Sequence, residues 1–174
     1  MNHIEIRKIS FANLVQLQEI GRQTFTETFS SSNTEGNMKT YLEEGFSVEK
    51  LTAELQNPES EFYFASLNET VIGYLKINFG QAQTEPQVEK SLEIERIYVL
   101  QDFHGKKVGQ LLYEKAIEIA KNKKVDFVWL GVWEENNRAI QFYTKNGFVA
   151  YDQHIFTLGA DEQTDIMMKL ELSR

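Results

Sequence analysis

The sequence contains no cysteine among its 174 residues and only two prolines. The lack of cysteine excludes disulfide bonds, catalysis through a thiolate and the usual zinc sites. No stretch approaches the roughly 20 consecutive apolar residues of a membrane-spanning helix. The opening residues, MNHIEIRKIS, lack the apolar core of a signal peptide. We therefore expect a cytoplasmic protein that has no membrane partner.

Basic residues are in the minority, with 18 Lys and Arg against 26 Asp and Glu and a net charge of -8. Nucleic-acid phosphates bind to a basic face, so this balance argues against nucleic acid as the main partner. It suits a cationic ligand. The length fits one domain with a core of its own, and we expect residues 1–174 to form it.

Histidine is also scarce, and the three histidines, His3, His104 and His154, lie far apart in the sequence. Their spacing matches no metal-binding motif. We expect surface or turn positions for all three, and no metal site.

Strands and helices alternate along the chain. Hydrophobic periodicity predicts strands at 3–9, 61–67, 71–79, 91–100, 126–133, 148–157 and 164–172. It predicts helices at 11–29, 34–44, 48–56, 106–122 and 137–146, with a loop over GQAQTEPQ (80–87). Asn68-Glu69-Thr70 is a hairpin signal. The order predicts an α/β fold with a mixed sheet, not a doubly wound parallel sheet.

A strand passes into a helix through Gly105-Lys106-Lys107-Val108-Gly109. The unpaired backbone N–H groups at such a helix start can bind an anion, and glycine permits close approach. The pattern is neither a Walker P-loop nor GxGxxG. A tight turn with two solvated lysines is the alternative, and the stretch alone leaves both open.

A second segment, WEENNRAIQFYTKNGF (133–148), favours the anion-binding interpretation of this turn. With it the sequence resembles the GNAT superfamily of acetyl-CoA-dependent N-acetyltransferases. In that family a phosphate-binding Arg/Gln-x-x-Gly-x-Gly/Ala turn is followed by Asn-x-x-Ala-x-x-Phe-Tyr-x-x-x-Gly-Phe. The second pattern is complete here, as Asn136, Ala139, Phe142, Tyr143, Gly147 and Phe148. The first is partial: Gly109 matches, whereas His104 and Lys107 replace the Arg/Gln and the first glycine.

The resemblance implies a mixed, mostly antiparallel central sheet of six to seven strands, flanked by helices, whose splayed parallel strands bind acetyl-CoA. It implies that backbone N–H groups of residues 105–110 hold the pyrophosphate and that the strand end pairs with the pantetheine amides. The implied cofactor-binding residues are Ile97, Tyr98, Val99, Gly105, Lys106, Lys107, Val108, Gly109, Gln110, Asn136 and Tyr143. Asn136 is also a candidate helix N-cap.

The segment TFTETFSSSNTEGNMKTYLEEGFSVEKLTAEL (24–55) resembles the bacterial PaiA-type polyamine acetyltransferases, which are related in mechanism to spermidine/spermine acetyltransferases. This resemblance implies a small cationic amine as acceptor, with spermidine and spermine as examples. The acidic residues of positions 43–61 are candidates for lining its site, or else form a solvated face. They are Glu43, Glu44, Glu49, Glu54, Glu59 and Glu61.

A carboxylate is needed to deprotonate the acceptor amine. The resemblance to spermidine/spermine acetyltransferases implies Glu95 as this base, with Glu93 as the second candidate. Their spacing of two puts both on one strand face, with Ile97 and Val99. An apolar face would raise their pKa values, which suits a base. The alternative is that they pair with cations such as Arg96 or face solvent.

Tyr143 is the candidate acid that protonates the departing thiolate, because a phenol stays protonated at neutral pH. We expect Phe142 to pack in the core and Tyr143 to lie at the cofactor edge. Without cysteine, direct attack by the amine in a ternary complex is the simplest route. Two other functions stay open: a peptide or protein N-alpha or lysine acetyltransferase, and a non-catalytic acetyl-CoA-binding regulatory module. A homodimer is compatible with the sequence.

Overall fold

The computed structural model describes residues 3–85, 90–158 and 160–172. Every strand and helix expected from the sequence is present and in the expected order. The largest changes at an element start are three residues: β7 begins three residues before its expected position, and α1 begins three residues after, behind a 3-10 turn. The expected loop over 80–87 runs beyond Glu85 and so leaves the described residues. The elements are β1 (Ile4–Lys8), α1 (Leu14–Phe29), α2 (Glu35–Gly45), α3 (Val48–Gln56), β2 (Ser60–Leu67), β3 (Thr70–Asn78), β4 (Ser91–Val99), α4 (Val108–Asn122), β5 (Phe127–Trp133), α5 (Asn137–Lys145), β6 (Val149–Leu158) and β7 (Asp161–Glu171).

The strands form one seven-stranded sheet in the order β1-β2-β3-β4-β5-β7-β6. All neighbouring strands are antiparallel except β4 and β5, which run parallel. This confirms the expected mixed, mostly antiparallel sheet.

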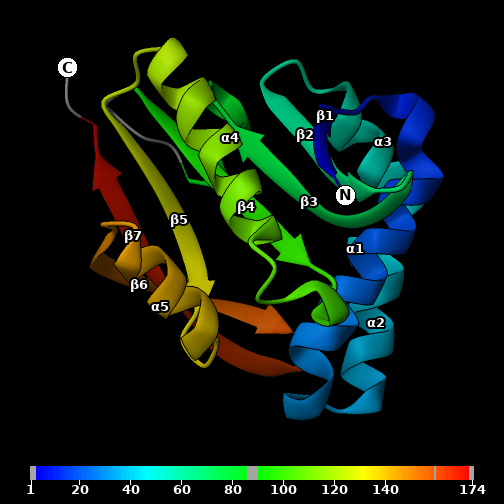
Figure 1. Cartoon of the computed structure of the whole chain (residues 1–174). Coiled ribbons are helices and arrows are strands. Elements are labelled where there is room, and N and C mark those ends of the chain that lie inside the picture. The colour runs from blue at the N-terminus through cyan, green and yellow to red at the C-terminus, as the bar shows by residue number, and fades with distance from the viewer. Residues whose placement is uncertain (1–2, 86–89, 159, 173–174) are drawn as a thin grey trace.

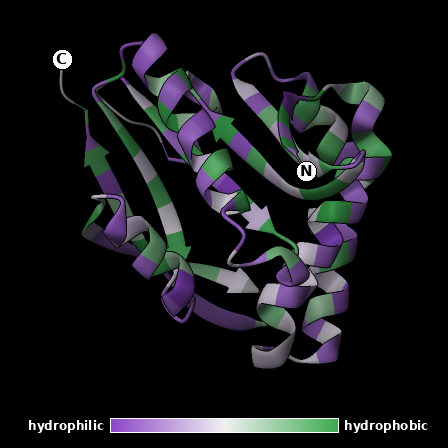
Figure 2. Ribbon diagram, viewed as in Figure 1, coloured by the Kyte–Doolittle hydropathy of each residue, from purple (hydrophilic) through white to green (hydrophobic). Residues whose placement is uncertain are grey.

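Helices cover both faces of the sheet, and each face has its own apolar core (Figure 1). One core joins the sheet to α4 and α5, and includes Leu112 and Tyr143. The other joins it to α1, α2 and α3, and includes Phe29 and Trp133. Hydrophilic residues run along the outer side of α4, while β5 is largely hydrophobic (Figure 2). None of the helices in the described segments is both long and apolar enough to span a bilayer.

Local chemistry sets the element ends where the sequence suggests it. The Ser47 hydroxyl accepts a hydrogen bond from the backbone N–H of Lys50 (3.1 Å) and caps α3. Gly147 ends α5 with a φ of +98°, a left-handed conformation that favours glycine. Asn68 and Glu69 also have positive φ, as a two-residue hairpin turn requires.

The strands β4 and β5 separate part-way along their length. Their parallel pairing ends at Glu93 opposite Trp129. Just beyond, β4 has a bulge: Lys76 pairs with Arg96 and Ile77 with Ile94, so Glu95 is an extra residue. The separation opens space between the strand ends.

Candidate active site

A cleft of about 910 Å³ lies where β4 and β5 have separated. The end of β4, the start of α4, α5 and the end of α1 form its walls. Of the expected cofactor-binding residues, Lys106 does not line the cleft, and its Nζ lies over the ring of Phe103. The others line it: Ile97, Tyr98, Val99, Gly105, Lys107, Val108, Gly109, Gln110, Asn136 and Tyr143.

The turn before α4 forms one end of this cleft. Gly105 and Lys107 both have left-handed backbones, with φ of +80° and +66°. A left-handed conformation costs a residue other than glycine about 1–2 kcal/mol, so the turn is strained at Lys107. No side chain caps α4, which leaves the N–H groups of its first turn available to an anion. The turn therefore has the features of a phosphate cradle.

The aromatic pair on α5 is arranged in the opposite way to expectation. Tyr143 is the buried member, 4% exposed, whereas Phe142 is half-buried. Both rings line the cleft, so burial does not remove Tyr143 from it. Burial raises the pKa of the Tyr143 hydroxyl, which therefore keeps its proton at neutral pH.

Asn136 is the expected helix N-cap, and it also lies in the cleft wall. Its side chain accepts a hydrogen bond from the backbone N–H of Ala139 (3.2 Å) and caps α5. The same residue also lines the cleft. On the opposite side, the Nε2 of His104 lies 2.9 Å from the carbonyl oxygen of Val99 and fastens the turn to β4.

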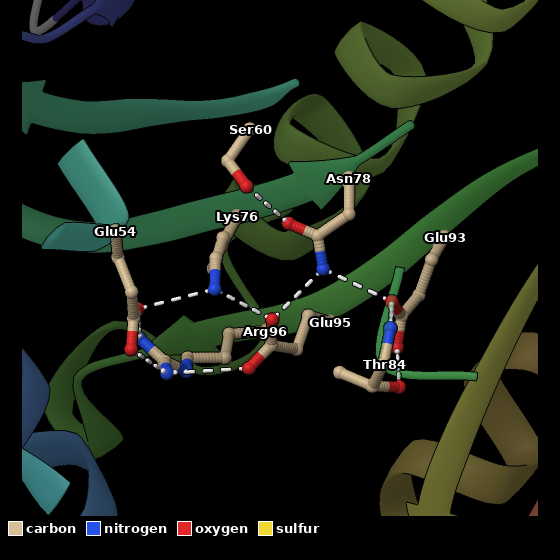
Figure 3. Close-up of polar contacts among 8 residues, drawn as sticks. All are labelled: Glu54, Ser60, Lys76, Asn78, Thr84, Glu93, Glu95 and Arg96. Atoms are coloured by element: carbon tan, nitrogen blue, oxygen red, sulfur yellow. Dashed lines mark hydrogen bonds and ion pairs between the residues drawn. The ribbon is translucent and has the colours of Figure 1, made fainter. Parts of the chain in front are cut away.

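Four charged side chains form a buried network at the bulge in β4 (Figure 3). The Nζ of Lys76 lies 3.1 Å from Glu54 and 2.6 Å from Glu95. The guanidinium of Arg96 lies 3.0 Å from Glu54 and 3.2 Å from Glu95. The network joins α3, β3 and β4, and its two carboxylates balance its two cations. We call these four residues the ionic network.

This arrangement matches a known family. The model of the acetyltransferase (GNAT) family fits residues 21–148, which is well over half of the chain. The chain belongs to the GNAT family. Membership confirms the expected enzyme class, an acetyl-CoA-dependent N-acetyltransferase.

Individual GNAT relatives extend the match along nearly the whole chain. An uncharacterized N-acetyltransferase of Lactobacillus delbrueckii subsp. lactis is 37% identical over 172 residues, which cover 99% of each chain. The spermidine N(1)-acetyltransferase of Thermoplasma acidophilum is 29% identical over 153 residues, 86% of this chain and 90% of the relative. The crystal structure of the PaiA N-acetyltransferase from Thermoplasma acidophilum in complex with coenzyme A has a TM-score of 0.80 and 27% identity, over 98% of this chain and 99% of that one.

For Glu95, the first base candidate of this GNAT chain, the expected pKa direction was wrong. Burial favours a higher pKa, but the charges of Arg96 and Lys76 outweigh it and lower the pKa to about 2. The expected face shared with Ile97 and Val99 was wrong as well. Because of the bulge, Ile97 and Val99 belong to the core under α4 and α5, while the ionic network lies against rings of the other core.

Glu93 is 3% exposed, and burial raises its pKa, as expected. Its carboxylate accepts hydrogen bonds from the backbone N–H (2.8 Å) and hydroxyl (2.6 Å) of Thr84. The Asn78 side-chain amide donates to both Glu93 (3.0 Å) and Glu95 (2.8 Å), so one amide joins the two carboxylates. Neither carboxylate lines the cleft.

The acidic residues of positions 43–61 do not form one lining. Glu43, Glu44 and Glu49 are exposed, as in the solvated alternative. Glu54 belongs to the ionic network, and Glu61 accepts a hydrogen bond from the Tyr63 hydroxyl (2.6 Å).

Sequence reasoning named Arg96 as a possible partner of the β4 carboxylates, which Glu95 confirms, but it missed two others. Lys76 and Asn78 lie on β3, and their period-two spacing puts them on one face. A polar pair in an otherwise apolar strand was the available signal. Reasoning also missed Trp133, which ends β5 and lines the cleft, and the basic Arg138 and Lys145 of α5, which line it too. No motif marks these three positions.

Proposed function

We propose that this enzyme transfers the acetyl group of acetyl-CoA to a primary amine of a small cationic acceptor, with polyamines such as spermidine and spermine as the acceptor class. The cleft between the separating ends of β4 and β5 carries this proposal. The spermidine acetyltransferase among the relatives supports the acceptor class. The coenzyme A complex of a similar structure supports the donor.

The residues of the cleft suit coenzyme A. In this proposal the pyrophosphate lies against the first-turn N–H groups of α4, and Lys107 adds positive charge. Beyond Glu93, the β4 edge has no β5 partner among the described residues. The amides of pantetheine can pair with such an edge, as an added strand would, at residues 97–99. A backbone N–H near Val99 is then available to polarise the thioester carbonyl.

The chemistry follows from the cleft without a covalent enzyme intermediate. The neutral amine nitrogen forms a bond to the thioester carbon, and the bond from that carbon to sulfur breaks. Tyr143 donates its hydroxyl proton to the departing thiolate, a role that its place in the cleft supports. The proton lost by the amine passes to a carboxylate.

The carboxylate base is proposed in the reverse of the expected order. Glu95 is fixed by two cations, and a group with a pKa of about 2 accepts a proton poorly at neutral pH. Glu93, with its raised pKa, is the better base. Because Glu93 does not line the cleft, it would act through water.

The decisive experiment measures release of the CoA thiol from acetyl-CoA with a panel of amines, and identifies the acetylated product by mass spectrometry. We expect turnover with polyamines. Tyr143→Phe should keep the affinity for acetyl-CoA and lower kcat by roughly 10²–10⁴-fold, the usual range for a lost proton-transfer group. An unchanged kcat would remove Tyr143 from the mechanism.

The same assay separates the two base candidates. Glu93→Gln should lower kcat at neutral pH and recover partly at high pH, where free amine no longer needs a base. The Glu95→Gln variant should retain more of kcat than the Glu93→Gln variant, when it is assayed at a temperature at which it is folded. The reverse result would restore Glu95 as the base. Turnover only with peptides would favour the peptide acetyltransferase, and acetyl-CoA binding without any turnover would favour the regulatory module.

A further inference from the structure

The cleft reaches both faces of the sheet where β4 and β5 separate. Val99 and Tyr143 in its wall belong to the core under α4 and α5. Tyr98 and Trp133 in the same wall belong to the core under α1–α3. An acceptor bound on this second face therefore has a path to an acetyl group held on the first.

One carboxylate lies on the second face beside this opening. Asp165 of β7 is the antiparallel partner of Trp133 of β5, so the two side chains share a face and their Cα atoms are about 4.5–5.5 Å apart. The Trp133 indole is held by a hydrogen bond from its Nε1 to Gln163 (2.9 Å) and by packing on Phe29. A Cβ at Gly131 would lie 3.3 Å from the Oδ2 of Asp165, so the glycine keeps space beside the carboxylate.

Asp165 shares the charge of the nearby His154 imidazole with two other carboxylates. On β6, the imidazole of His154 is already bonded to Glu85 (2.7 Å) and Asp152 (3.2 Å). Tyr41 of α2 is the remaining titratable group that interacts with Asp165. Within the described segments, the Asp165 side chain makes no hydrogen bond or ion pair.

A half-buried carboxylate without a partner is unfavourable in the free protein. Burial raises the pKa of Asp165 from its usual 3.8 to about 6, against the lowering effect of His154. A bound cation would remove this cost, since a charge-assisted hydrogen bond is strongest where water is partly excluded. The neighbouring ring of Trp133 also attracts cations and can pack against a methylene chain.

We propose that Asp165 binds a second ammonium group of the acceptor and thereby selects diamines and polyamines over monoamines. The reacting nitrogen lies in the cleft by Tyr98 and Trp133, the methylene chain crosses the Trp133 ring, and the second nitrogen meets Asp165. This inference rests on the proposed amine acetylation, and it adds the residue that recognises the part of the acceptor that does not react.

The test compares 1,4-diaminobutane with butylamine, which has the same carbon chain and one nitrogen fewer. For the diamine, Asp165→Asn should lower kcat/KM by roughly 10- to 100-fold, the range of a lost hydrogen bond to a charged group. For butylamine, kcat/KM should change less than about twofold, and the KM for acetyl-CoA should not change. The matched control is Glu162→Gln, which removes an exposed charge on the other face of β7. This variant should have the same kcat/KM as the unaltered enzyme for both amines.

A pH series adds a readout that a purely structural role would not move. The ratio of kcat/KM for diamine and monoamine should fall as the pH drops through about 6, because Asp165 becomes protonated. Both amines stay protonated in this range, so their own titration cancels in the ratio. His154 also titrates nearby. The Asp165→Asn variant separates the titration of His154 from that of Asp165, because the diamine-to-monoamine ratio of this variant should no longer depend on pH.

The outcomes distinguish this inference from the function on which it rests. Equal losses for both amines, or no loss for the diamine, would overturn the role of Asp165 and leave amine acetylation intact. Failure of the unaltered enzyme to acetylate any amine would overturn the proposed function, and the role of Asp165 with it.

Discussion

Two carboxylates on the same side of the sheet have opposite surroundings. Glu95, in the ionic network, touches two cations and one amide, and the charges of Arg96 and Lys76 hold its pKa near 2. Asp165, beside Trp133, has no partner among the described residues, and burial raises its pKa to about 6. The same functional group is thus stabilised as an anion in one region and disfavoured in the other.

The two carboxylates therefore differ in what they do. Glu95 forms ion pairs that connect elements of the fold, whereas in our proposal Asp165 binds a ligand. The ionic network joins α3, β3 and β4 at the bulge of β4, just beyond the point where the pairing of β4 with β5 ends. Asp165 supports no such junction. The comparison makes a direct prediction: neutralising each region should change the free energy of unfolding with opposite sign.

The largest effect is expected from Lys76→Met. The Lys76 side chain is 6% exposed and contacts both carboxylates of the network. Removal leaves two buried carboxylates with one cation, and breaking such a pair typically lowers the free energy of unfolding by about 3–5 kcal/mol. Urea denaturation at pH 7 measures the change.

The matched control for this variant is Lys115→Met. Lys115 pairs with Glu118 at 3.8 Å at the surface of α4, where the two side chains are 32% and 61% exposed, and its Nζ lies 5.6 Å from the centre of the Tyr63 ring. Exposed pairs contribute about 0–1 kcal/mol, so this substitution should have little effect. If both variants lost the same free energy of unfolding, the buried ion pairs of the ionic network would contribute no more to stability than an exposed pair.

The next effect in size is expected from Glu95→Gln, and it should depend on pH. Because the pKa of Glu95 falls from 4.5 to about 2 on folding, its stabilisation is complete above pH 4.5 and disappears as the pH falls towards 2. The shift corresponds to about 3 kcal/mol at pH 7. Denaturation curves of both proteins between pH 2 and 7 should therefore converge in acid. A gap that stays constant down to pH 2 would show that the loss comes from packing instead of charge.

The sequence predicted this enzyme best where the signal is local. Helix caps such as Ser47, the stop at Gly147 and the complete motif from Asn136 to Phe148 each depend on residues near one another in the chain. The mixed, mostly antiparallel sheet and the expected cofactor-binding residues that line the cleft followed from those motifs and the family that they resemble.

The electrostatics of β4 could not be predicted in this way. A strict alternation of faces assumes an unbroken strand, and the extra residue at Glu95 reverses it for Ile97 and Val99. The partner Lys76 lies on another strand, so sequence spacing does not reveal the ion pair. Asp165 gave no signal at all, because its importance comes from the position of Trp133 across β5 and β7.

The smallest change, and the one of opposite sign, is expected from Asp165→Asn. The folded-state pKa of about 6 lies above the usual 3.8, so the folded protein becomes less stable as the pH rises from about 4 to about 6. Asparagine keeps the shape and removes this loss. After allowance for screening by solvent, the variant should gain about 1 kcal/mol in free energy of unfolding at pH 7 and nothing at pH 4. Glu162→Gln, on the exposed face of the same strand, should stay within about 0.5 kcal/mol at both pH values. A loss of stability at pH 7 would mean that the Asp165 carboxylate has a structural partner. A gain of stability, together with loss of diamine selectivity, would show that the enzyme retains a destabilising charge because the acceptor needs it.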